Sequence, residues 1–124
     1  MTTYVSQAPD RGPTVYVVQQ VLEWSDKEGR LVPKFDMSPA REHGEVVYLL
    51  SPSAKPFDRS VIAQLRHGLR HFGTHEGDSI LGTGSPVLIA AAAAIAAQEG
   101  DGKLTVLQWN RERQGYRRVM LDLW

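Results

Sequence analysis

Hydrophobic positions fall into short runs separated by glycine, proline and charged turns. Residues 14–22 are rich in β-branched and aromatic side chains, and residues 30–35 form a second apolar run after the polar turn at 26–29. Two such runs around a turn predict an N-terminal β-hairpin. Residues 45–50 form a nearly continuous apolar run, which is typical of a strand buried on both faces.

The spacing changes to that of helices in two later segments. From Asp58 onward, Ile62, Leu65, Leu69 and Phe72 recur at intervals of three and four residues, and Gly73 ends the pattern. This predicts a helix with one apolar stripe, capped by Asp58. A shorter helix of one or two turns is expected after Ser38-Pro39, and it would end at Gly44.

The second long helix begins at Ser85-Pro86 and ends at Gly100. Alanines fill most of residues 90–97 and leave almost no polar face. We therefore expect this helix to be covered, either between the sheet and the first helix or in a subunit interface.

A brief strand at 78–81 precedes this helix, and residues 103–109 and 116–123 predict a C-terminal hairpin. The whole pattern predicts an α/β fold: a single-domain mixed sheet with an N-terminal hairpin, a strand-helix-strand-helix-strand parallel core and a C-terminal hairpin. We expect one domain over residues 1–124, with residues 1–13 poorly ordered.

Composition excludes several classes of protein. The chain has 124 residues, a formal net charge of zero and no cysteine, which excludes a disulfide framework and thiolate zinc sites. No basic and apolar leader occurs at the start, and the longest apolar stretch, at 86–97, is short of the ~20 residues that a membrane span needs. We expect a cytoplasmic protein with no membrane partner.

One candidate site is the glycine turn before the alanine-rich helix. A glycine turn that leads into a helix N-terminus can bind a phosphate or carboxylate through its amides. The third glycine of a dinucleotide fingerprint and the Gly-Lys-Ser/Thr of a P-loop are both absent. The alternative is a tight turn with a helix cap. The residues of this candidate anion site are Gly82, Thr83, Gly84 and Ser85.

A second candidate is the arginine-rich tip of the C-terminal hairpin. Guanidinium groups bind carboxylates or phosphates, and aromatic side chains stack or bury apolar area. This predicts a surface for a protein partner or, alternatively, for nucleic acid; a solvated turn is the third possibility. The residues are Trp109, Arg111, Arg113, Tyr116, Arg117 and Arg118.

No residues indicate a cofactor or a metal. His67, His71 and His75 are spaced four apart, as helical metal ligands are, but glycines interrupt the segment and arginines alternate with the histidines. We interpret them as a hydrated basic face. No catalytic residue can be named, because no Gly-x-Ser-x-Gly elbow or comparable motif occurs.

Four segments resemble small uncharacterised proteins of tailed bacteriophages. These are residues 35–40, 44–52, 84–90 and 107–111 with Tyr116, and the resemblance extends over 35–124. It implies a phage product in the cytoplasm of the bacterial host that binds another molecule, and it brings no catalytic residues.

Taken together, these features predict a non-enzymatic binding or regulatory protein that acts through protein–protein contacts. Trp124 at the end of an apolar strand and the alanine-rich helix favour a homo-oligomer. The alternatives are a protein that binds a nucleotide or phosphate at the glycine turn, and a nucleic-acid-binding protein that uses the arginines.

Overall fold

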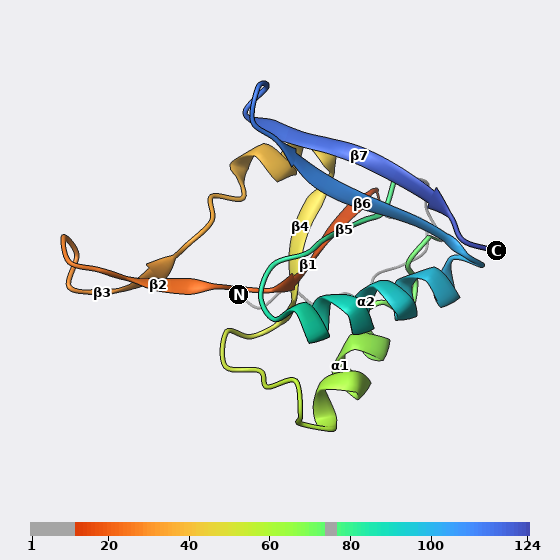
Figure 1. The fold of residues 1–124 in the computed structure, drawn as a ribbon, viewed down its shortest axis with the longest axis horizontal. Coiled ribbons are helices and arrows are strands. Elements are labelled where there is room, and N and C mark those ends of the chain that lie inside the picture. Colours follow the sequence, from red (N-terminus) through yellow and green to blue (C-terminus); the bar gives the residue numbers. More distant parts are fainter. Residues whose placement is uncertain (1–11, 74–76) are drawn as a thin grey trace.

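The computed structural model describes residues 12–73 and 77–124. Its centre is a five-stranded sheet in the order β4-β1-β5-β6-β7 (Figure 1). Strands β4, β1, β5 and β6 are parallel, and β7 is antiparallel to β6. The strands of this sheet are β1 (Thr14–Gln19), β4 (Glu45–Leu50), β5 (Ser79–Leu81), β6 (Lys103–Asn110) and β7 (Gly115–Asp122).

This architecture confirms the predicted α/β class, with a parallel core and a C-terminal hairpin. In that hairpin Trp109 is opposite Tyr116, and Leu107 is opposite Arg118. The short turn at 111–114 joins the two strands and sets this register, as expected for an antiparallel pair.

The N-terminal hairpin is present, but its composition differs from the expected one. Residues 14–19 do not pair with residues 30–35; they form β1, which lies between β4 and β5 in the main sheet. The hairpin consists of β2 (Leu22–Ser25) and β3 (Arg30–Pro33) alone. Five residues of β1 have no exposed surface and Gln19 has 6%. A strand so deeply buried is stable only with neighbours on both edges, which a two-stranded hairpin cannot supply.

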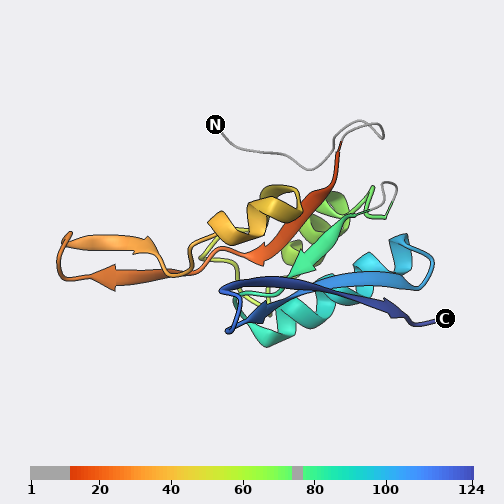
Figure 2. The same cartoon turned by 90° about the horizontal axis from the view of Figure 1, so that it is seen from above.

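Strands β2 and β3 form an arm, residues 22–33, that projects away from the main sheet (Figures 1 and 2). Trp24 is opposite Leu31 across the arm, and both side chains are more than half exposed. At the tip, the indole N–H of Trp24 donates to Asp26 and Arg30 pairs with Glu28. The arm therefore carries an apolar pair in solvent-exposed positions.

Helices α1 (Ser60–Gly68) and α2 (Pro86–Glu99) cover one face of the sheet, and the 3-10 helix η1 (Ser38–His43) lies on the other (Figure 1). The predicted bounds of α2 are confirmed. Helix α1 is shorter than expected: it begins after Asp58, whose carboxylate accepts the Ser60 amide at 3.0 Å, and it ends at Gly68. Leu69 and Phe72 are nevertheless buried, because the turn that follows folds back on the core.

The connections that follow the neighbouring strands β1 and β5 cross opposite faces of the sheet. The chain passes from β1 to β4 by way of the arm and η1, whereas α2 joins β5 to β6 across the other face. In open α/β sheets, a crevice forms at the carboxyl ends of two such strands, and ligands commonly bind there. The candidate site lies at this end of the sheet.

Helix α2 packs on the sheet and beside α1, as expected for a covered helix, but its outer side faces solvent. Val87 is 60% exposed, and Ala90 and Ala94 are also exposed. Within the described residues, no helix is long and apolar enough to cross a membrane. The sequence predicts poor order at residues 1–13. Of these, residues 1–11 lie outside the described ranges.

Candidate functional site

A groove of about 840 Å³ lies on the η1 face, at the carboxyl ends of β5 and β6. Its floor includes Leu81 and Leu107, two buried side chains of the sheet. One wall is the segment that leads from the arm to η1, and the opposite wall is the β6–β7 hairpin. The lining residues are Lys34, Phe35, Asp36, Pro39, Leu81, Gly82, Thr83, Gly84, Leu107, Trp109, Gln114 and Tyr116.

Aromatic side chains dominate the walls of the groove. The rings of Trp109 and Tyr116 meet edge to face, with centroids 5.0 Å apart. Phe35 stands on the opposite wall, and the Lys34 ammonium lies 5.5 Å from the centre of its ring. Phe35 is 41% exposed and Trp109 is 44% exposed, so both keep apolar area available for a partner.

Tyr116 interacts with its surroundings through its main-chain carbonyl and its hydroxyl. The ring nitrogen Nε2 of His43 lies 3.1 Å from the Tyr116 carbonyl oxygen; because the carbonyl can only accept, Nε2 carries the hydrogen. Burial raises the pKa of the Tyr116 hydroxyl, and the negative charge of Asp36 raises it further. The pKa of Asp36 is itself lowered, first by the hydrogen bond from the Ser38 amide, at 2.9 Å. Asp36 is therefore a carboxylate at neutral pH.

Tyr116 is expected to ionise at a higher pH than an ordinary tyrosine, above about 10. Burial and Asp36 disfavour the ionised form of Tyr116 in the folded chain but not in the unfolded chain. The contribution of Tyr116 to stability is therefore complete below the pKa of the unfolded chain, and it is lost as the pH rises through the higher pKa of the folded chain. The ultraviolet absorbance of tyrosinate during an alkaline titration measures this. Tyr116→Phe should remove a late step, and Asp36→Asn should move that step to lower pH; an unchanged curve in both variants would contradict the assignment.

The glycine turn borders the groove, and a buried glutamine meets it from behind. The Ser85 amide donates to the side-chain oxygen Oε1 of Gln19 at 3.1 Å, and the Thr83 hydroxyl donates to the Gln19 carbonyl. Gly84 has a φ of +97°, and a Cβ there would collide with the Gln19 side chain. The turn therefore requires glycine both for its backbone conformation and for space.

The amide of Gln19 also ties the loop after β4 to this point. Its Nε2 donates to the carbonyls of Ser51, at 3.2 Å, and Ala54, at 3.0 Å. Gln19 thus occupies the crevice between the ends of β1 and β5, where an open α/β sheet commonly holds its ligand. The Ser85 amide, which would face an anion at the start of α2, has a partner within the chain.

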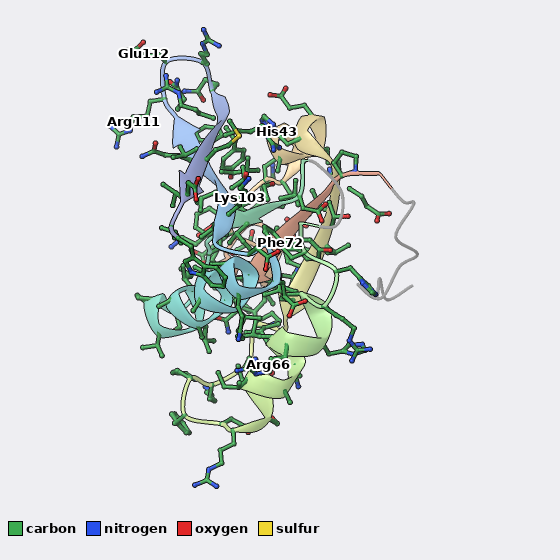
Figure 3. The ribbon with its side chains drawn as sticks, turned by 90° about the vertical axis from the view of Figure 1, so that its right-hand side faces the viewer. His43, Arg66, Phe72, Lys103, Arg111 and Glu112 are labelled. Atoms are coloured by element: carbon green, nitrogen blue, oxygen red, sulfur yellow. The ribbon has the colours of Figure 1, made fainter. Side chains whose placement is uncertain are left out.

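Three of the four candidate arginines border one depression, and the fourth, Arg111, lies at the hairpin tip. Arg117 is beside Gln108 and Arg118 is beside Leu107 in the ladder, so the two side chains start on opposite faces. Arg118 donates to the Gly77 carbonyl at 2.9 Å. Arg111 lies with Glu112 at the tip of the hairpin, away from the body (Figure 3). Arg113, Arg117 and Arg118 all line a separate depression beside η1, of about 630 Å³.

The histidines do not converge either, as far as the structure describes them. His67 is exposed on α1, with its Nδ1 3.5 Å from an Arg70 nitrogen, and His71 lies beyond the helix end. His75 lies outside the described residues. Within residues 12–73 and 77–124, no group of three side chains of ligand type could hold a metal ion.

The structure therefore unites two regions that the sequence presents as separate candidates. Gly82, Thr83 and Gly84 share the groove with Trp109 and Tyr116. Sequence reasoning missed the third contributor, residues 34–36, because Lys34 and Phe35 fall at the end of a predicted strand and the segment carries no motif. It also missed Gln19, whose only signal is a polar residue at the end of an otherwise apolar run.

Comparisons with known proteins bear on the origin of the chain. No curated protein and no solved structure matched it. Residues 13–123 match the family described as Phage Pam3 gp32-like protein. The match includes every helix and strand of the fold, and it confirms the resemblance to small phage proteins that the sequence suggested. The chain belongs to the Phage Pam3 gp32-like protein family.

Proposed function

We propose that this member of a phage protein family is a non-enzymatic binding protein, and that it holds an apolar segment of a protein partner in the groove. The observation that carries the proposal is the convergence of Phe35, Trp109 and Tyr116 on one open groove. Tryptophan and tyrosine are enriched among the residues that contribute most to protein–protein binding. Half-exposed aromatic side chains around an apolar floor suit such a contact.

The charges in the groove favour a protein partner over a polyanion. Among the described residues, Lys34 and Asp36 are the charged residues that line it, and their formal charges cancel. A nucleotide at the glycine turn would compete with Gln19 for the Ser85 amide. A polyanion would instead meet the cations of the depression beside η1, which Arg113, Arg117 and Arg118 line, and that depression is separate from this groove.

Strand order favours an extended partner segment. The ladder between β5 and β6 is short, with Ile80 opposite Val106, and β5 ends at Leu81. Strand β6 continues to Asn110, past the end of its neighbour and along the groove. A partner strand could add beside this part of β6, which is a common way for a sheet to bind a peptide.

Site-specific photo-crosslinking in phage-infected cells tests the proposal. A benzoylphenylalanine in place of Phe35 should form a discrete adduct with one protein, and Trp109→Ala should abolish that adduct. The matched control is the same probe in place of Phe57, which is 84% exposed in the loop before α1 and does not line the groove. Equal adducts from both positions, or an adduct that nuclease removes, would refute a protein-binding groove.

A further inference from the structure

Strand β7 forms one border of the sheet, and among the described residues its ladder partner is β6. It is eight residues long, and after Gly115 it contains no glycine or proline that would interrupt pairing. Large apolar side chains at its end are exposed: Met120 is 78% exposed and Trp124 is 74% exposed. A long border strand with exposed apolar residues is a template for pairing with another strand.

Two hydrogen bonds show which backbone groups of β7 point outward. The Leu123 amide donates to the Gly102 carbonyl at 2.7 Å, so the backbone of Leu123 points toward β6. The Tyr116 carbonyl accepts from His43 of η1, so the backbone of Tyr116 points away from β6. Backbone groups alternate in direction along an antiparallel strand. The outward-directed residues of the open part are therefore Arg118, Met120 and Asp122.

Opposite charges flank Met120 on this open part: Arg118, which also donates to the Gly77 carbonyl, and Asp122, which lies opposite Lys103 in its own sheet. In an antiparallel pair of identical strands, residues equally far from the two-fold axis lie opposite each other. With Met120 on the axis, Arg118 of each copy lies opposite Asp122 of the other, and both residues direct their backbone groups to the partner.

Other registers lose this complementarity. An axis at Arg118 or at Asp122 sets like charges opposite each other, which is unfavourable. An axis at Val119 sets Asp122 opposite Tyr116, and an axis at Leu121 sets Asp122 opposite Met120, so in neither register do the opposite charges meet. A two-fold axis that passes between two adjacent residues would place an outward-directed residue opposite an inward-directed one. A regular ladder does not allow this pairing.

We propose that two copies of this chain associate through their β7 strands, antiparallel, with Met120 on the two-fold axis and two Arg118–Asp122 ion pairs across it. The ladder would include about six main-chain hydrogen bonds, two for each outward-directed pair. The two five-stranded sheets become one continuous sheet. The three residues that pair, Arg118, Met120 and Asp122, do not line the groove.

A charge exchange tests both the dimer and its register, by sedimentation velocity over a range of concentrations. The wild-type chain should be a dimer. In the Asp122→Arg variant, each new arginine lies opposite Arg118 of the other copy. These like charges should raise the Kd of the dimer by about tenfold or more. The double variant R118D/D122R restores opposite charges and should recover the dimer. Circular dichroism confirms folding, since Arg118 also donates to Gly77.

Two further variants separate this strand from the outer side of α2. Met120→Lys places like charges on the axis and should give monomers, whereas Val87→Lys, at an exposed position of α2, should leave the dimer intact. A wild-type monomer at every concentration, a double variant that stays monomeric, or dissociation by Val87→Lys but not by Met120→Lys would each overturn the proposal.

Discussion

Replacing Gln19 with leucine is expected to lower the free energy of unfolding by about 3 kcal/mol. The side chain is 6% exposed, and its amide group bonds to the Ser85 amide and to the carbonyls of Ser51 and Ala54. Leucine has a similar size but offers no donor or acceptor. Each buried polar group that loses its partner without gaining water costs about 1–3 kcal/mol.

Urea denaturation followed by circular dichroism measures this loss. The matched control is Gln98→Leu, the same exchange at an exposed position of α2, which should change stability by less than about 0.5 kcal/mol. A loss for Gln19→Leu as small as that of the control would mean that the glycine turn and the loop after β4 do not depend on this amide.

Replacing Asp78 with alanine is expected to cost a similar amount, about 3 kcal/mol. The residue is 4% exposed, and its carboxylate accepts from the Thr14 amide at 2.9 Å and from the Gly73 amide at 3.2 Å. These bonds join the start of the central strand β1 to the turn after α1. Alanine removes both acceptors from a site in which Thr14 has no exposed surface.

Thermal and urea unfolding check this second expectation. Asp78→Asn keeps one acceptor oxygen and should recover part of the loss. Glu99→Ala removes an exposed carboxylate near the end of α2 and should be close to neutral. If Asp78→Ala were as stable as Glu99→Ala, the carboxylate would not be what anchors β1.

The difference between the predicted and observed pairing of residues 14–19 has a physical cause. The apolar run predicts a strand correctly, and the turn at 26–29 predicts a hairpin correctly. Which strands pair is a competition among surfaces far apart in the chain, and β1 buries more in the centre of the sheet than it could beside β3. The same uninterrupted apolar character at 45–50 was the signal of a strand buried on both faces, and it applies to 14–18 as well.

The helices show a similar limit. The apolar spacing correctly identified Leu65, Leu69 and Phe72 as buried, but only Leu65 is within α1. Ile62 is 41% exposed, and its neighbour Val61 is buried instead. Spacing alone cannot distinguish a continuing helix from a turn that places its side chains on the same core.

By itself, the sequence determined the strands of the main sheet, where α2 begins and ends, and the C-terminal hairpin, but it did not separate β2 from β1. Those features depend on residues a few positions apart: a proline that starts a helix, a glycine that ends one, and a turn that brings two strands together. The tertiary structure decided that Phe35 faces Trp109 across one groove, that Gln19 fills the crevice behind the glycine turn, and that Arg118 and Asp122 share one open strand edge. Such contacts join segments separated by tens of residues, and they exist only after the sheet order has fixed which surfaces meet.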